Sequence, residues 1–266
     1  MAESADNPDG RIVTERDGHI FIMRIDRPHK LNGFTPKMFR ELAAAFTEME
    51  NDPEIRVGLL CPVGPHFTAG LDLPKFTELM QRGEVIIPDG MIDPFDLREP
   101  RRTKPVVIAV RGITFTVGTE FSLAADVAVA GTDCRFNQIE VKRGIMATGG
   151  PTVRMVERAG FGNAMALLLT GDEFDAETAL RLNFVAKVVP PEQVIDEALA
   201  IARRIAAAAP LAVMATRRNA KMALEQGRHA AIAEFDRTNR MLSRTEDAAE
   251  GVAAFREKRE PNFKGR

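Results

Sequence analysis

The 266-residue sequence contains no tryptophan, no tyrosine and only two cysteines. Without tryptophan and tyrosine, only phenylalanine could provide aromatic surfaces on which single-stranded nucleic acids stack. Cys61 and Cys134 lie far apart in the chain, so we predict neither a disulfide framework nor a paired-cysteine zinc site. The formal net charge of −2 gives no general reason to expect a nucleic acid or a membrane as partner.

Several catalytic and cofactor-binding motifs are also missing. The chain has no GxGxxG after a predicted strand, no GxxxxGK[ST] phosphate loop and no GxSxG nucleophile elbow. Its four histidines show no spacing typical of metal ligands, so no metal site is predicted. These absences disfavour nicotinamide oxidoreductases, kinases, zinc enzymes and Ser-His-Asp hydrolases. The N-terminus is polar and no apolar run approaches about 18 residues, so we expect a cytoplasmic protein.

The first half of the chain alternates β-prone runs with helical periodicity. Residues 11–25 contain two β-prone runs around Asp17-Gly18 and therefore predict a hairpin. A helix is predicted next, with Thr35 as its N-cap and Pro36 in its first turn. Residues 81–104 are rich in proline and charge, so we expect a long surface loop of the kind that often forms a lid. Short buried strands are predicted at 57–63, 105–110, 126–131 and 184–189.

Helical patterns dominate after Gly149. They predict helices at 151–159, 162–170, 175–182, 191–208, 211–225, 228–243 and 246–258. This order predicts an α/β core over residues 1–200, followed by a helical region over residues 201–266. The alanine-rich helices of the last third are of the kind that pack against neighbours, including other subunits.

Three segments could build a site that acts on a carbonyl group. HFTAGLDL (66–73) has a small-residue turn before a predicted helix, and TFTVGTE (114–120) follows a predicted strand in the same way. Free N–H groups at these two turns could form an oxyanion hole. Glu120 and the Glu140 of FNQIEVKRG (136–144) could fold face to face as an acid–base pair. The residues alone leave an ordinary alternative open, in which the glycines only make turns and Glu120 only favours a helix start.

These segments, in this order, resemble motifs of the enoyl-CoA hydratase/isomerase (crotonase) superfamily. HFTAGLDL is similar to F-[CS]-[AS]-G-x-D-[LI], and PVVIAVRGITFTVGTEFSLAAD is similar to P-V-I-A-A-V-N-G-x-x-x-G-G-G-x-E-L-x-x-x-C-D. FNQIEVKRGIMATGGPTVRM resembles F-G-x-P-E-x-x-x-G-x-x-P-G-x-G-G-T-x-R-L, and AFREKREPNFKGR resembles the family's last CoA-contacting helix. The resemblance runs nearly end to end. It implies a crotonase-like spiral of ββα turns, a C-terminal α-helical trimerisation region, trimers that often pair as hexamers, and an acyl-CoA substrate without a separate cofactor.

The resemblance also assigns roles to residues. The N–H groups of Leu71 and Val117 would form the oxyanion hole, and Glu120 and Glu140 would flank the water that adds to the double bond. Hydration of an enoyl-CoA is the implied activity. Double-bond isomerisation, another thioester reaction such as hydrolysis or C–C cleavage, and a non-enzymatic RNA-binding or scaffold role are the alternatives. Substrate or CoA contacts are implied for Arg27, His29, Lys30, Leu31, Ala69, Asp72, Lys75, Gly118, Phe255 and Lys258.

The sequence departs from the family pattern at Thr116-Val117-Gly118, where three glycines are usual. An oxyanion needs only an N–H group, so Val117 can serve, but we expect its β-branched side chain to narrow the pocket or shift the substrate. Ala147-Thr148 replaces the usual proline and glycine, so the loop that holds Glu140 could follow a different path. We expect the basic run REPRRTKP (98–105) to be a solvated part of the surface loop, with pairing to CoA phosphates as the alternative.

Overall fold

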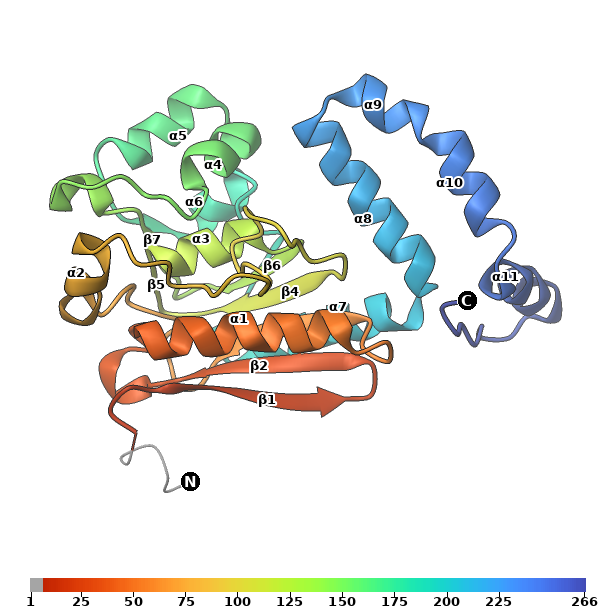
Figure 1. Ribbon diagram of the computed structural model, residues 1–266, viewed down its shortest axis with the longest axis horizontal. Helices are drawn as coiled ribbons and strands as arrows, with labels where there is room; N and C mark the ends of the chain where they lie inside the picture. Colours follow the sequence, from red (N-terminus) through yellow and green to blue (C-terminus); the bar gives the residue numbers. More distant parts are fainter. Residues whose placement is uncertain (1–6) are drawn as a thin grey trace.

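The computed structural model describes residues 7–266, except for the side chains of Glu78 and Met80. A six-stranded sheet lies at its centre, with strands in the order β1-β2-β3-β4-β6-β9 (Figure 1). β1 and β2 pair antiparallel as the predicted hairpin, and the remaining neighbours pair in parallel. The six strands span Arg11–Asp17, Ile20–Asp26, Val57–Pro62, Val106–Val110, Val127–Gly131 and Lys187–Val189.

A second, three-stranded sheet has the order β5-β7-β8. The sequence patterns do not predict it, because strands of two or three residues carry almost no periodicity. The sheet is important for the site, since β5 leads into helix α3 and β7 leads to the short 3-10 helix η2 (Glu140–Arg143). Its strands span Ile113–Phe115, Arg135–Asn137 and Phe174–Asp175.

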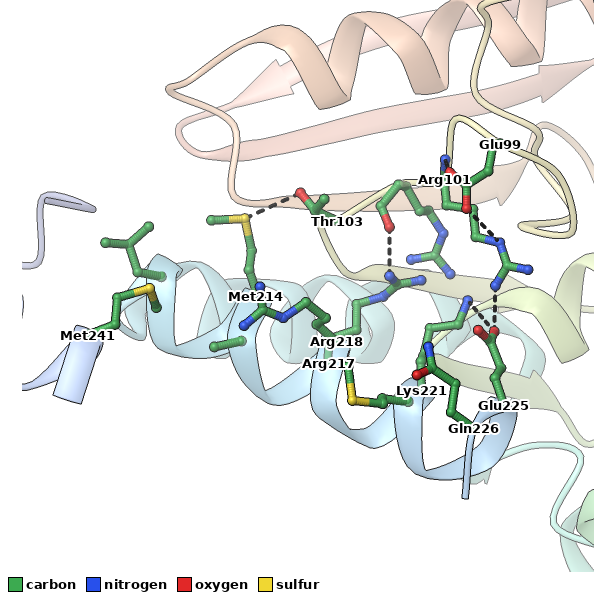
Figure 2. Close-up of a pocket in the computed structure, with 14 residues that line it drawn as sticks. Glu99, Arg101, Thr103, Met214, Arg217, Arg218, Lys221, Glu225, Gln226 and Met241 are labelled. Carbon is green, nitrogen blue, oxygen red and sulfur yellow. Dashed lines mark hydrogen bonds and ion pairs between the residues drawn. The ribbon is translucent and has the colours of Figure 1, made fainter. Parts of the chain in front are cut away.

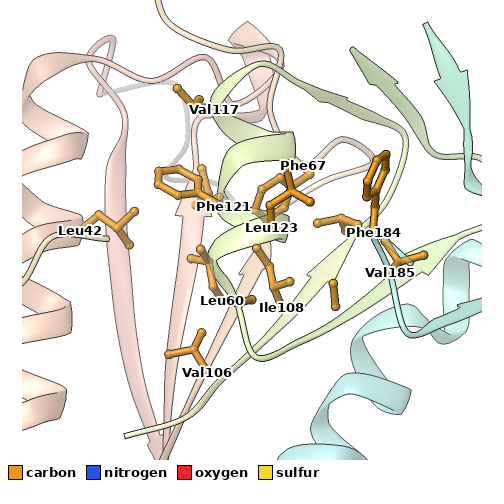
Figure 3. Close-up of a cluster of buried hydrophobic side chains, with 14 of the residues drawn as sticks. Leu42, Leu60, Phe67, Val106, Ile108, Val117, Phe121, Leu123, Phe184 and Val185 are labelled. Carbon is orange, nitrogen blue, oxygen red and sulfur yellow. The ribbon is translucent and has the colours of Figure 1, made fainter. Parts of the chain in front are cut away.

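Helices cover both faces of the larger sheet. Alternate residues of a strand point to opposite faces, so Met23 of β2 packs in the cluster that includes α1 and α3, whereas Ile22 packs with α7. In the first cluster, Phe121 and Leu123 of α3 lie over Ile108 and its neighbours on the sheet (Figure 3). The helices of this half are α1 (Pro36–Asn51), α2 (Leu73–Gln81), α3 (Val117–Ala124), α4 (Pro151–Ala159), α5 (Phe161–Leu168), α6 (Ala176–Arg181) and α7 (Val194–Ala207), with 3-10 helices η1 (Pro28–Lys30) and η3 (Pro191–Gln193).

The last four helices form what we call the helical arm, α8 to α11. α8 lies beside the core, and α9 to α11 stand away from the sheets (Figure 1). The predicted division at residue 200 falls inside α7, whose buried face continues to Ala206 on the sheet. The predicted helix at 228–243 is two helices that meet at Glu234. The arm consists of α8 (Pro210–Glu225), α9 (Arg228–Ala233), α10 (Phe235–Leu242) and α11 (Glu246–Glu257).

None of the helices within residues 7–266 is by itself long and apolar enough to cross a membrane. By length and composition alone, the segments 191–207 and 210–225 pass that test together, but they meet at an angle of 109°. The buried face of α7 packs on the six-stranded sheet.

The basic run at 98–105 differs from the expectation of a solvated loop. Arg102 is 2% exposed and Lys104 is 7% exposed. Lys104 Nζ donates at 2.5 Å to the carbonyl of Asp52, which lies just beyond the end of α1. Arg102 Nη2 donates at 2.7 Å to the carbonyl of Ala124, which is the last residue of α3. The C-terminal end of a helix carries partial negative charge and unpaired carbonyls. These two cations therefore anchor the 81–104 loop to two helix ends.

Candidate active site

The turn at Ala69-Gly70 and the start of α3 are in direct contact. Thr68 and Thr114 form a parallel β-bridge, and Phe115 N donates to Thr68 O at 3.0 Å. Gly70 has a φ of 106°, and a Cβ added there would collide with Thr116 Oγ1. Only glycine therefore fits this turn without strain or displacement. The two turns expected to provide oxyanion donors lie side by side.

In both turns the carbonyl that precedes the candidate N–H group is held in place. The carbonyl before Leu71 accepts a hydrogen bond from Phe34 N at 2.8 Å, and the carbonyl before Val117 accepts one from Gln138 Nε2 at 3.1 Å. A trans peptide points its C=O and N–H in opposite directions. Anchoring each carbonyl therefore fixes the direction of the N–H of Leu71 or Val117. As the first residue of α3, Val117 has no acceptor for its N–H within the helix.

Glu120 lies in the first turn of α3 and is 4% exposed. Its Oε1 accepts a hydrogen bond from Gly149 N at 2.8 Å. Burial raises the pKa of Glu120 from 4.5 to about 7; the Gly149 hydrogen bond lowers this pKa, the charge of Glu140 raises it and Arg154 lowers it. A carboxyl group with this pKa can exchange a proton with a substrate near neutral pH.

Glu140 begins η2 and is half-buried. Burial raises its pKa, and its own backbone N–H opposes that shift. Its Oε2 is buried without a hydrogen-bond partner in the part of the chain that the structure describes. The loop after Glu140 passes directly over Glu120, because a Cβ added to Gly149 would collide with the Glu120 carboxyl group. The replacement of proline and glycine by Ala147-Thr148 therefore still leaves the loop in contact with Glu120.

No metal centre accompanies the two glutamates within residues 7–266, where no three histidine, cysteine, aspartate or glutamate side chains are grouped as metal ligands. What the arrangement offers is a buried carboxyl, a half-buried carboxyl and two oriented N–H groups. Such a set can move a proton and stabilise a negatively charged oxygen.

Thr116 lies in this site, although the sequence analysis assigns it no role there. Its φ of 47° and ψ of −112° lie in a region of backbone conformation that usually only glycine adopts. A non-glycine residue in such a conformation is strained by about 1–3 kcal/mol. Its Oγ1 is buried and lacks a hydrogen-bond partner among the described residues. Val117 is 5% exposed, and its side chain belongs to the main apolar cluster (Figure 3). The sequence feature that could have identified Thr116 is its position as the first residue of a motif that usually has three glycines.

The loop around η1 packs against the Ala69 turn. Ala69 N donates to Leu31 O at 2.9 Å, and Thr68 Oγ1 donates to Asn32 O at 2.7 Å. His29, Lys30 and Leu31 are exposed on this loop. The structure therefore brings four of the residues with implied CoA contacts together beside the candidate oxyanion turn.

Other residues with implied CoA contacts have structural partners. Arg27 is 3% exposed, donates to Gly33 O at 2.8 Å and pairs with Asp72 at 2.9 Å. Lys75 pairs with Asp9 near the N-terminus. These ion pairs tie the η1 loop and the N-terminal segment to the start of α2.

Phe255 and Lys258 lie apart from the other candidate residues of this chain. Phe255 is on α11, at the end of the helical arm, and its side chain is 85% exposed (Figure 1). Lys258 is the C-cap residue of the same helix and is also exposed. Their large exposure leaves both side chains available to a neighbouring molecule.

Two cavities border α8, and neither is lined by the two glutamates. One of about 520 Å³ lies between α8 and the loop that precedes β4 (Figure 2), and one of about 870 Å³ lies between α8, α3 and α4. Some of their charged side chains form ion pairs across the elements: Asp96 with Arg217 at 2.8 Å, and Arg101 with Glu225 at 2.5 Å. We interpret these ion pairs as the joint between the 81–104 loop, the arm and the core.

Comparisons with known proteins show the family of the chain. The family model described as enoyl-CoA hydratase/isomerase matches residues 15–266. Enoyl-CoA hydratase EchA19 from Mycobacterium tuberculosis is 34% identical and covers 100% of both chains. (E)-Benzylidenesuccinyl-CoA hydratase from Thauera aromatica is 32% identical over 96% of this chain and 99% of its own.

Among solved structures, a probable enoyl-CoA hydratase/isomerase from Mycobacterium abscessus matches with a TM-score of 0.92 and 42% identity. The match covers 96% of this chain and 98% of that one. The expected crotonase fold is thus confirmed. The chain belongs to the enoyl-CoA hydratase/isomerase family.

Proposed function

We propose that this protein is an enoyl-CoA hydratase, which adds water across the 2,3 double bond of an enoyl-CoA. The observation that carries the proposal is that the charge of Glu140 acts on the buried Glu120, which lies in the first turn of the helix that Val117 begins, beside the Leu71 turn. Relatives named enoyl-CoA hydratase, at 30–34% identity over nearly the whole chain, support the same reaction.

The proposed reaction begins with a single proton on the pair of carboxyl groups. The ionised carboxylate takes a proton from water as the water oxygen bonds to C3, and the protonated carboxyl gives its proton to C2. The electrons of the double bond pass through the thioester, whose oxygen becomes enolate-like and is held by the N–H groups of Leu71 and Val117. Loss of one such donor typically costs about 3–4 kcal/mol of transition-state stabilisation. The raised pKa of Glu120 supports a pair that keeps one proton near pH 7.

The direct test follows the absorbance of the conjugated thioester of a short 2-enoyl-CoA. Because the chain has no tryptophan or tyrosine, its own near-ultraviolet absorbance is low. Glu120→Gln and Glu140→Gln should each abolish most of the activity, whereas Glu48→Gln, an exposed position on α1, should leave it unchanged. If both active-site variants keep the wild-type rate, the assignment of these residues is wrong.

Double-bond isomerisation is also a proton transfer that these carboxyl groups could perform, so product identification must accompany the rate measurement. A panel of acyl-CoA thioesters with different chain lengths and branching should yield 3-hydroxyacyl-CoA products. If the main product is an isomerised enoyl-CoA, the activity is isomerisation and not hydration. If the main product is free CoA, the activity is thioester hydrolysis. The same panel would identify the acyl group.

We further propose that the arm mediates assembly into trimers, which can pair as hexamers. Large apolar side chains are exposed along it, such as Phe235 at 54%, Val252 at 52% and Phe255 at 85%. Burial of such side chains stabilises an interface by about 25 cal/mol per Å². Within an assembly, Phe255 and Lys258 could contact the CoA of a neighbouring subunit. Sedimentation at micromolar concentration tests the proposal, and a monomer would contradict it.

We propose that the core continues to the end of α7 and that the arm is a second unit. The buried face of α7 packs against the sheet up to Ala206, which supports a division after residue 207.

We also propose that the protein works in the cytoplasm. Cys61 and Cys134 are both buried free thiols, as expected in a reducing compartment. Localisation of the tagged full-length chain tests this proposal.

A further inference from the structure

Three N-cap threonines allow a direct comparison within this chain. Thr35 accepts a hydrogen bond from Met38 N at 3.2 Å, and Thr245 accepts one from Ala248 N at 3.1 Å. Thr116 precedes α3 but makes no capping bond. Its φ is 47°, whereas φ is −101° at Thr35 and −79° at Thr245. The hydroxyl of Thr116 is therefore unavailable for the role that threonine usually has at this position.

The Thr116 hydroxyl lies against the turn that carries the other candidate oxyanion donor. It is close enough to Gly70 that an added Cβ would collide with it. Gly70 directly precedes Leu71 and Thr116 directly precedes Val117, so the hydroxyl lies where the two turns that carry the candidate N–H groups touch. Its oxygen is buried and has no partner within residues 7–266.

A buried amide next to Thr116 gives a second, independent sign of a ligand at this point. Gln138 is 1% exposed, and its Nε2 donates to Thr116 O. Its Oε1 is buried and also lacks a partner in the described chain. Unpaired buried polar groups are uncommon in folded proteins, and each calls for an explanation such as a catalytic role or a bound water. Two of them belong to Thr116 and Gln138, which are joined by a hydrogen bond at the start of α3, where the proposed substrate would bind.

We propose that Thr116 Oγ1 donates a third hydrogen bond to the thioester oxygen, alongside the N–H groups of Leu71 and Val117. The inference rests on the proposed function, because that function places the oxygen at this point. Negative charge grows on the oxygen as water adds to C3, so the hydrogen bond strengthens in the transition state. The strained backbone of Thr116 is then the conformation that aims its hydroxyl at the substrate.

Three substitutions separate the hydroxyl from the shape and the strain of Thr116. Thr116→Ser keeps the hydroxyl, Thr116→Val keeps the shape without it, and Thr116→Gly removes both the hydroxyl and the strain. We expect Thr116→Ser to retain kcat within about 3-fold, and Thr116→Val and Thr116→Gly to lose about 10- to 100-fold in kcat with little change in KM. Thr116→Gly should at the same time unfold at a higher temperature than the wild type.

A spectroscopic measurement reports on the oxyanion directly. Acetoacetyl-CoA forms an enolate that absorbs in the near ultraviolet, where this chain has little background. A third donor should lower the apparent pKa of the bound 3-ketoacyl thioester, so the apparent pKa should be about one pH unit higher on Thr116→Val than on the wild type or Thr116→Ser. A merely structural role for Thr116 would leave this value unchanged.

The outcomes distinguish this inference from the proposed function. The inference alone is overturned if the wild type hydrates an enoyl-CoA but Thr116→Val and Thr116→Ser have equal kcat. It is also overturned if Thr116→Gly is at least as active as the wild type. A wild-type protein that neither hydrates any enoyl-CoA nor binds acetoacetyl-CoA refutes the proposed function, and the inference with it.

Discussion

Replacing Glu120 by glutamine should stabilise the protein at alkaline pH while removing its activity. Burial raises the pKa of Glu120 from 4.5 to about 7. Between these two pH values the folded protein keeps a proton that the unfolded chain has released. The free energy of unfolding therefore falls as the pH rises through this window and levels off above about pH 7. Glutamine does not titrate, and its oxygen can still accept the hydrogen bond from Gly149.

The size of the effect follows from the two pKa values. At about 1.4 kcal/mol for each pH unit, the change from 4.5 to about 7 corresponds to about 3 kcal/mol. Glu120→Gln should therefore raise the free energy of unfolding by up to about 3 kcal/mol at pH 8 and by much less at pH 5. In a chain of this length, that corresponds to a rise of roughly 5–10 °C in the unfolding midpoint.

Urea unfolding followed by circular dichroism measures this difference, since the chain has no tryptophan or tyrosine to report by fluorescence. The protein concentration must be the same in all samples, because assembly would also contribute to stability. Glu48→Gln, at an exposed position on α1, is the control and should show no comparable dependence on pH. An equal stability difference between Glu120→Gln and the wild type at pH 5 and pH 8 would refute the reasoning.

Three further predictions concern the carboxyl pair, the contact of Gly149 with Glu120, and the ion pairs of Asp96. The kcat/KM of hydration should fall as the pH rises above about 7, because the carboxyl pair then loses the proton that it must donate; a pH–rate profile that stays flat to pH 9 would contradict this. Gly149→Ala should lower kcat at least 10-fold with a native circular dichroism spectrum, because the added Cβ collides with the Glu120 carboxyl; a wild-type rate would show that the carboxyl can move. Asp96→Ala should lower the free energy of unfolding, measured in urea, by about 3 kcal/mol, because it removes the buried carboxylate that Arg217 and Lys221 share, although Arg217 keeps its pair with Asp126; unchanged stability would show that solvent or Asp126 compensates for the loss.

The elements with strong local signals could be predicted from the sequence. The capping threonine at 35, the proline at 36 and the apolar spacing predict α1, which is found from Pro36 to Asn51. The hairpin around Asp17-Gly18 is also confirmed, and α4 lies at the predicted residues 151–159. Caps, turns and periodicity act over a few residues, so neighbouring residues contain most of the information needed.

Elements that exist only through pairing with distant segments could not be predicted in this way. β5, β7 and β8 have two or three residues each and are defined by their partners in the sheet. The basic run at 98–105 looks like a solvated loop, yet Arg102 and Lys104 are buried, because carbonyls at two helix ends accept their hydrogen bonds and Asp126 pairs with Arg102. Burial of a charge depends on what the fold places beside it.

The sequence by itself determined the family, the order of the motifs and the candidate residues Leu71, Val117, Glu120 and Glu140, because those follow from residue types at fixed spacing. Only the tertiary structure decided how they are oriented. The pKa of Glu120 depends on burial and on Gly149, 29 residues further along the chain. The Thr116 hydroxyl, unpaired among the residues that the structure describes, depends on a backbone conformation that β7 and the Gly70 turn hold in place. Both properties arise from contacts between segments that are distant in sequence, and the pattern of residues does not contain those distances.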